Sequence, residues 1–289
     1  MQLLSVGEVA ALLGVSPSAV RMWGTRYGLT ASARSAGGHR RYTEDDVRRL
    51  QAVQTAVLAG EDPAAAAGVE RTGRRGGPGG AGLAVPGAGR EARGLARAAA
   101  RLDELRAEDA VLAALRERGT TAAWDDVVRP VLVAAGSNWA ATGDGIEVEH
   151  LLTQAVVSAL VRWTASLPEP PADRPVLLAG GPQEEHILPL HAVRAALTER
   201  GVPARLLGPR TPGTALAAAA RRTRAAAVLV WLSRPDEDPA GLVAAVGAAH
   251  RRVRVLLGGP GWDEPPPAGA ALCAGLADAA GLAEEAWHR

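Results

Sequence analysis

The chain has 289 residues, a formal net charge of +1, 47% hydrophobic residues and one cysteine. This length allows two or three domains, each large enough to bury a core. The lone Cys273 excludes an internal disulfide framework, and no run of eighteen apolar residues or leader-like N-terminal segment is present, so we expect a cytoplasmic protein without a membrane span.

Two short helices are predicted at the start of the chain. Residues 5–14 open with Ser5 and Glu8 at the spacing of a capping box, followed by an apolar helical period. Ser16 and Pro17 are placed as the N-cap and first residue of a second helix that runs to about residue 26.

A small basic wing and a third helix are predicted next. The Gly37-Gly38 pair permits a tight reversal, and the helix from Thr43 has acidic residues in its first turn, which suits the helix dipole. Residues 1–60 carry seven arginines against four acidic side chains. Together these features predict a winged helix-turn-helix DNA-binding domain over residues 1–67.

The predicted DNA contacts come from the second helix and the wing. The helix would enter the major groove, where Arg21 can reach a guanine edge or a phosphate. The wing supplies cations and a hydroxyl suited to phosphate contacts, which position a protein without recognising sequence. The candidate DNA-binding residues are Ser18, Arg21, Arg26, Tyr27, His39, Arg40, Arg41 and Tyr42.

A linker and a helical region are predicted in the middle of the chain. Residues 68–94 hold ten glycines without a helical period, which is typical of a flexible linker. Helical patterns resume near Glu91 and continue to about residue 167, with breaks at Gly119-Thr120 and at 142–145. Residues 95–168 are therefore predicted to form a four-helix bundle.

The last part of the chain, residues 174–289, alternates short apolar runs with amphipathic stretches. This alternation predicts βαβ units and a parallel sheet of five strands with both faces covered, in a flavodoxin-like (Rossmann-type) order. The predicted strands are 175–180, 204–208, 226–233, 253–259 and 270–275.

A ligand site is expected at the carboxyl ends of these strands, where the strand order reverses. Glu184 and His186 follow the first strand, Ser233 follows the third, and Gly258-Gly259 follow the fourth. A histidine held by a carboxylate is a well-oriented metal ligand, because the carboxylate fixes its tautomer. Paired glycines allow a bulky ligand to approach the backbone. His191 lies on a different helical face and is expected to be an ordinary surface residue.

Residues 3–67 resemble the MerR family of winged-helix regulators in the pattern RxWxxRYGL…GGHRRY. The resemblance implies a homodimer or higher oligomer that binds a two-fold operator in promoter DNA and competes there with RNA polymerase. Gly24 departs from the family pattern, which often has Glu after the tryptophan. MerR proteins usually dimerise through a long helix at the position of the glycine-rich linker, so dimer contacts are expected elsewhere.

The C-terminal part resembles the cobalamin-binding domain shared by B12-dependent methyltransferases, mutases and CarH/LitR-like photoreceptors. Its motif, an acidic residue, x, His, x, x, Gly, matches Glu184-x-His186-x-x-Pro189, with Pro189 replacing the glycine. The resemblance implies that His186 is the lower axial ligand of cobalt and that Ser233, Gly258 and Gly259 contact the cofactor.

The helical region resembles the same photoreceptors, which carry Trp, nine residues, then Glu-His. Trp139, Glu149 and His150 have this spacing. An indole over the cofactor, with Glu and His able to bond a sugar, suits the adenosyl group of adenosylcobalamin. The photoreceptors have a histidine after the tryptophan, where this chain has Ala140, so light sensing through that histidine is not implied.

The sequence thus predicts a non-enzymatic transcriptional repressor controlled by adenosylcobalamin, and through it by light, by ligand-dependent oligomerisation. One alternative is a MerR-type regulator that binds another tetrapyrrole or a small apolar molecule, which Pro189 and Ala140 favour. Another is an α/β domain that only mediates oligomerisation. A methyltransferase or mutase module is disfavoured, because the linker and small bundle leave no room for a substrate-activating domain.

Overall fold

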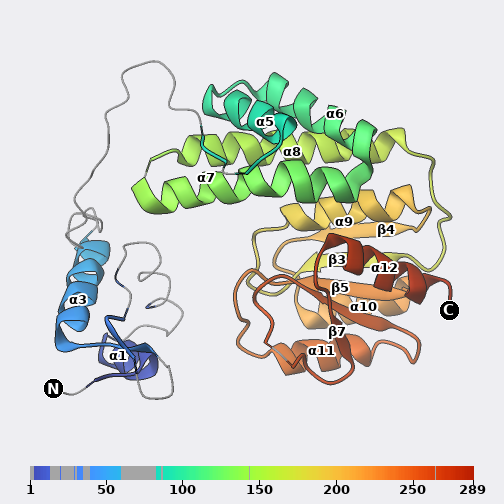
Figure 1. Cartoon of the computed structure of the whole chain (residues 1–289). Coiled ribbons are helices and arrows are strands. Elements are labelled where there is room, and N and C mark those ends of the chain that lie inside the picture. The colour runs from blue at the N-terminus through green and yellow to red at the C-terminus, as the bar shows by residue number, and fades with distance from the viewer. Residues whose placement is uncertain are drawn as a thin grey trace. The chain divides into compact units, whose positions relative to one another are not determined.

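The computed structural model describes residues 3–13, 20, 29, 31–34, 40–59, 83–85, 87–142, 144–263 and 265–289 (Figure 1). The chain divides into two compact units, residues 1–81 with 135–146, and residues 82–134 with 147–289. Within the described ranges, no helix combines the length and the apolar character that a membrane span requires.

The first unit begins with helix α1 (Val6–Leu13), and its capping box is formed as predicted. The Ser5 amide donates to Glu8 Oε2 at 2.7 Å, and the Glu8 amide donates to Ser5 Oγ at 3.3 Å. Hydrogen bonding of the Glu8 carboxylate to the Ser5 amide, and then to the Ser5 hydroxyl, holds the pKa of Glu8 below its ordinary value. The two bonds of the capping box satisfy two backbone donors that the start of a helix leaves unpaired.

A short antiparallel ladder and helix α3 (Glu44–Ala59) complete the described part of this unit. Strands β1 (Ala33–Arg34) and β2 (Arg40–Arg41) pair, and the backbone of Leu4 bonds to that of Tyr42 in both directions. The predicted second helix, Val20 apart, and the glycine reversal lie outside the described residues. The core consists of Val9, Ala10, Leu13, Val20, Leu29, Tyr42, Val47 and Leu50.

The helical region contains α5 (Arg90–Ala100), α6 (Glu104–Ala123), π-helix η1 (Trp124–Val128), α7 (Arg129–Thr142) and α8 (Ile146–Ser166). Both predicted breaks are confirmed, since Gly119 has φ 74° and α7 ends at Thr142. The predicted return of helical structure near Glu91 is confirmed, because α5 starts at Arg90, so the last residues of the predicted linker 68–94 belong to this helix. The sequence also gave no sign of the break at Leu102, which has φ 54°, or of the π-helix.

The α/β domain has five parallel strands in the order β4-β3-β5-β6-β7. They are β3 (Val176–Gly180), β4 (Ala204–Gly208), β5 (Ala227–Trp231), β6 (Arg254–Gly258) and β7 (Ala270–Leu272). All five predicted strands and the flavodoxin-like order are therefore confirmed, with the order reversing between β3 and β5.

Helices cover both faces of this sheet (Figure 1). Helices α9 (Leu188–Glu199) and α12 (Leu276–Trp287) pack together, as do α10 (Gly213–Thr223) and α11 (Pro239–Gly247). All five residues of the interior strand β3 are buried, whereas the edge strand β4 alternates between half-buried and exposed. A continuous apolar run is what two covered faces require.

The end of α9 joins the helical region through Glu199. Its carboxylate accepts from the Thr120 amide at 2.9 Å, the Thr120 hydroxyl at 2.7 Å and the Trp163 indole at 2.7 Å. Thr120 is buried and follows the kink at Gly119. At the kink, the Thr120 amide thus finds its hydrogen-bond acceptor in a carboxylate of the α/β domain.

Candidate cofactor-binding site

The loop between β3 and α9 carries the Glu184–His186 pair. The Gly181 amide donates to the Trp231 carbonyl at 3.1 Å, and the Glu184 amide donates to the Gly181 carbonyl at 3.1 Å. A Cβ at Gly181 would lie 2.4 Å from Leu232 Cδ2, so a larger residue at this turn would require the Leu232 side chain to move. The loop is therefore folded tightly against the end of β5.

Glu184 joins two of the predicted site residues. It is 4% exposed, and its Oε1 accepts from the His186 amide at 2.6 Å and lies 3.1 Å from His186 Nδ1. Its Oε2 accepts from the Ser233 amide. One buried carboxylate thus links the loops after β3 and β5, which the predicted strand order brings to the same edge.

The Glu184 carboxyl group is held in its charged form. Burial raises its pKa, but hydrogen bonds from Ser233 and His186 outweigh burial, so the pKa lies below its ordinary value. A carboxylate accepts only, so in the neutral form of His186 the proton lies on Nδ1 and Nε2 keeps its lone pair. The His186 side chain is 68% exposed. The imidazole is therefore oriented by a buried anion and accessible from outside, as a metal ligand requires.

The glycine pair at the end of β6 accommodates Trp231 as well as a ligand. A Cβ at Gly258 would lie 3.0 Å from Trp231 Cε3. Gly259 has φ 97°, and a Cβ there would lie 2.2 Å from the Leu232 carbonyl oxygen. Close packing against β5 therefore requires glycine at 259 even without a ligand.

A cavity of about 520 Å³ lies at this edge of the sheet. Of the residues that the sequence singled out, the glycine pair and Pro189 line it, whereas Glu184, His186 and Ser233 do not. Residues of β5, α9, α12 and η1 that the sequence had not suggested complete the lining. The volume of the cavity falls within the range of small-molecule sites. The lining includes Trp124, Asp125, Arg129, Pro189, Val193, Leu229, Trp231, Gly258, Gly259, Pro260, Cys273, Leu276 and Ala279.

Cys273 is a half-buried thiol in this cavity, where burial and the nearby Asp278 raise its pKa to about 12. Trp231 Nε1 is buried and has no hydrogen-bond partner within the described part of the chain. A buried donor without a hydrogen-bond partner costs about 1–3 kcal/mol of folding free energy.

The predicted residues of the helical region are divided between the two units. Trp139 is half-buried on α7 in the first unit. Glu149 and His150 lie in the first turns of α8 in the second unit, half-buried and exposed respectively. Their joint action on a ligand stays a prediction.

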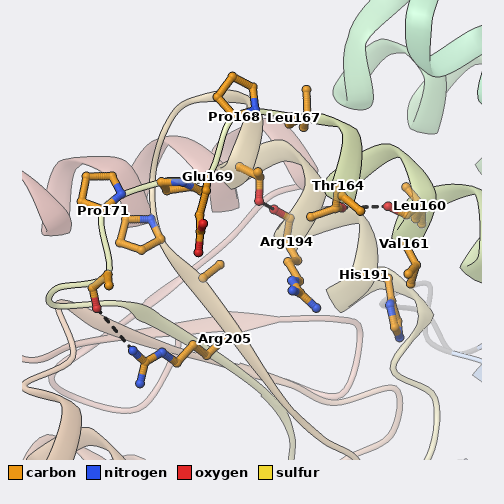
Figure 2. A pocket seen from close by; sticks show the side chains of 16 residues that line it. Leu160, Val161, Thr164, Leu167, Pro168, Glu169, Pro171, His191, Arg194 and Arg205 are labelled. Carbon is orange, nitrogen blue, oxygen red and sulfur yellow. Dashed lines mark hydrogen bonds between the residues drawn. The ribbon is translucent and has the colours of Figure 1, made fainter.

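A second cavity, of about 450 Å³, lies beside the proline-rich segment after α8 (Figure 2). His191 and Arg194 of α9 line it, and burial together with Arg194 lowers the pKa of His191. The Thr164 hydroxyl donates to the Leu160 carbonyl at 2.7 Å, and Arg205 donates to the Ala172 carbonyl at 3.3 Å. His191 is thus a half-buried residue of this cavity, and it does not line the cavity at the carboxyl edge of the sheet.

Most predicted DNA-binding residues lie outside the described residues, namely Ser18, Arg21, Arg26, Tyr27 and His39. Arg40 and Arg41 form β2, and the Arg41 side chain is 33% exposed. Tyr42 is 2% exposed and belongs to the core. The proposed phosphate contact of its hydroxyl conflicts with this burial; an aromatic ring next to two arginines was taken for a surface group, but its ring packs inward.

Comparison with known proteins defines the class of the two parts. Residues 4–69 match the model of the MerR HTH family regulatory proteins, so this part of the chain is a MerR-type DNA-binding domain. The fold of the second part is similar to that of the monomethylamine corrinoid protein of Methanosarcina barkeri, with a TM-score of 0.53 and 15% identity over 66% of this chain and 95% of that one.

One relative spans both parts. The HTH-type transcriptional repressor CarH of Myxococcus xanthus is 29% identical over 298 aligned residues, which cover 89% of this chain and 96% of that protein. The HTH-type transcriptional regulator MlrA of Escherichia coli is 39% identical over 54 residues, only 22% of its length. The chain is therefore built as a transcriptional regulator, with a MerR-type domain followed by a corrinoid-protein fold.

Proposed function

We propose that this protein is a cytoplasmic transcriptional repressor that binds a cobalamin at the carboxyl edge of its sheet, with His186 as the cobalt ligand. The observation that carries the proposal is the buried Glu184, which bonds His186 on one side and Ser233 on the other. Similarity to a named repressor over 89% of the chain supports the same function.

The residues present fit such a cofactor. A neutral imidazole with Nδ1 bonded to a carboxylate is a good donor to a transition metal through Nε2. The cavity at the same edge of the sheet is largely apolar, with Asp125 and Arg129 of the helical region as its charged lining residues. Pro189, at the position of the motif glycine, lines this cavity. A cavity of about 520 Å³ is present with proline at this position.

We further propose that the adenosyl form is the physiological ligand and that light controls its effect. When bound, adenosylcobalamin supplies a cobalt–carbon bond that visible light breaks. Trp139, Glu149 and His150 would enclose the adenosyl side, and Ala140 cannot bind metal. Any protein ligand on that side must therefore differ from the photoreceptor histidine, with His150 as one candidate.

The DNA-binding step would follow from the N-terminal domain. A dimer or larger oligomer would bind a two-fold site in promoter DNA and compete with RNA polymerase. Cofactor binding alters the oligomer only if it has different affinities for the two assemblies. The helical region and the α/β domain both line the cavity, so an occupant there would contact both.

The decisive experiment combines absorption spectroscopy with gel filtration. Purified protein is incubated with adenosylcobalamin in darkness, separated from free cofactor, and measured before and after green light. We expect a retained cobalamin spectrum with histidine in place of the cofactor's own base, and a larger species in the dark. His186→Ala should lose that spectrum, and His191→Ala, five residues along and outside the site, should keep it.

The outcomes separate the alternatives. Retention without a light response would leave a cobalamin sensor. No retention by the wild-type protein would contradict cobalamin binding and favour another tetrapyrrole or a small apolar molecule in the cavity. Unchanged assembly and DNA binding in His186→Ala, with no ligand retained by either protein, would indicate a domain that only mediates oligomerisation.

A further inference from the structure

Arginines gather at the amino edge of the sheet, where the strands begin. Val176 at the start of β3 lies beside Ala204 of β4 and Ala227 of β5. Ala227 in turn lies beside Arg254, the first residue of β6. Because these parallel strands start in register, the segments that precede them meet at one edge. The arginines of these segments and strand starts, called the amino-edge arginines below, are Arg174, Arg205, Arg222, Arg224, Arg251 and Arg252.

The positive charge of this edge is not neutralised by carboxylates of the described residues. No ion pair within this part of the chain involves any of the six amino-edge arginines. Arg174 and Arg205 each donate to a backbone carbonyl at 3.3 Å, which leaves their charge uncompensated. Arg200, by contrast, pairs with Glu284 at 2.7 Å. The amino-edge arginines therefore keep their charge available for an anion from outside.

A concave surface brings part of this charge together. A cavity of about 650 Å³ lies at the amino edge, and Asp173 is its acidic lining residue among those described. The backbones of Arg174 and Arg224 have φ 45° and 50°, a left-handed conformation that costs a residue with a Cβ about 1–2 kcal/mol. Strained residues of this kind are found frequently where a ligand binds. Four amino-edge arginines line the cavity, namely Arg174, Arg205, Arg222 and Arg224.

The carboxyl edge of the same sheet has the opposite charge. Its described arginines are Arg210, which pairs with Glu185, and Arg234. A polyanion is therefore attracted by the amino edge and repelled by the carboxyl edge, so the charge distribution orients the domain toward it. The carboxylates in the loops after β3, β5 and β6 are Glu184, Glu185, Asp236, Glu237, Asp238 and Asp263.

We infer that the amino edge of the α/β domain is a second DNA-contacting surface, which binds the phosphate backbone without reading base sequence. Arginine binds phosphate through two parallel hydrogen bonds, and duplex DNA is a dense array of phosphates. The edge presents no helix or β-ribbon to enter a groove, so it has no means of reading bases.

DNA is the polyanion that the rest of the chain brings to this edge. Residues 4–69 form a MerR-type DNA-binding domain in the same chain. DNA held by that domain is present at high effective concentration for the α/β domain, because the two are covalently linked. The inference goes beyond the proposed function and does not depend on cobalamin binding.

The test measures how salt weakens DNA binding by the full chain. Fluorescence anisotropy gives the affinity for a labelled duplex of mixed sequence between about 50 and 200 mM salt. The variant Arg205→Gln/Arg222→Gln/Arg224→Gln removes three exposed charges of the concave surface. We expect the slope of log affinity against log salt concentration to become shallower by about 2–3 for each bound protomer, since each phosphate contact contributes about 0.9.

A matched variant removes the same number of charges elsewhere. Arg97→Gln/Arg116→Gln/Arg234→Gln takes exposed arginines from α5, α6 and the carboxyl edge. It should keep the wild-type slope, because net charge changes equally but the amino edge is intact. Gel filtration without DNA should give both variants the wild-type size.

The outcomes separate this inference from its alternatives. Equal slopes for all three proteins, or equal losses in both variants, would refute a DNA contact at the amino edge. A changed size of the amino-edge variant alone, without DNA, would assign the edge to contact between copies of the chain and overturn the inference. If the wild type binds no DNA at any salt concentration, the proposed repressor function fails together with the inference.

Discussion

Two buried carboxylates, one in each unit, are held in the same way and yet serve different purposes. Asp46 is 2% exposed and accepts from the Ser32 amide, the Ser32 hydroxyl and the Thr43 amide at 2.7–3.0 Å, while Arg49 donates to its other oxygen at 2.7 Å. Glu184 is 4% exposed and bonds His186 and Ser233. For both, hydrogen bonds outweigh burial and the pKa is lowered.

The two carboxylates differ in whether their hydrogen-bond partners keep a group that can bind a ligand. Asp46 caps the start of α3 and bonds this helix to Ser32. The groups that donate to its oxygens serve only to hold the backbone and the helix in place. Glu184 orients an imidazole whose second nitrogen accepts no hydrogen bond from the described residues. A lowered pKa therefore shows only that a carboxylate accepts several hydrogen bonds. A binding site is indicated when one of its partners, here the imidazole, keeps a lone pair that no described protein group uses.

The largest effect is expected from breaking the Asp46 cluster. Asp46→Ala leaves the Ser32 and Thr43 amides without acceptors, and we expect it to destabilise the first unit by about 2–4 kcal/mol. Hydrogen exchange of peptides from α3 in the full chain measures this loss. Asp45→Ala, a neighbour with 63% exposure and surface ion pairs, should change it by less than about 0.5 kcal/mol. Similar losses for both variants would contradict the assignment.

A smaller effect on stability and a larger one on ligand binding are expected at Glu184. Glu184→Gln keeps the shape, but its amide nitrogen must face a donor at Ser233 or at His186. Because an oriented imidazole binds metal better, we expect cobalamin affinity to fall about 10–100-fold. Absorbance titration measures the change. Glu185→Gln, 61% exposed and paired with Arg210, is the control and should bind as the wild type does.

Much of this site could be predicted from sequence, because its key contacts are local or follow from topology. Glu184 and His186 are two residues apart, and Ser233 follows the strand that pairs with β3. Buried parallel strands appear as continuous apolar runs, so the sheet edge was predictable. Predicting these features requires only the hydrophobic pattern of the sequence and the order of the strands in the sheet.

The aromatic cavity could not be predicted, because it depends on packing between distant segments. Trp124 lies 107 positions before Trp231 and reaches the cavity through a π-helix, which has no known sequence pattern. The break at Leu102 was missed for a related reason, since leucine is not expected at positive φ. The phosphate contact predicted for the Tyr42 hydroxyl is wrong because this side chain packs with residues of α1 and α3, which lie far from it in sequence or on its other side.

The smallest effect is a difference in acid stability. A carboxyl group with a lowered folded pKa contributes stability that is present above its unfolded pKa, about 3.9 for Asp and 4.3 for Glu, and is lost as pH falls through the folded pKa. Both Asp46 and Glu184 are of this kind. Unfolding midpoints in urea between about pH 3 and 7 should therefore fall less steeply on acidification in Asp46→Asn and Glu184→Gln than in the wild type. Each variant should flatten the transition of its own unit, because the carboxylates lie in separate units. A change in the same transition for both would show that the two clusters stabilise one cooperative structure.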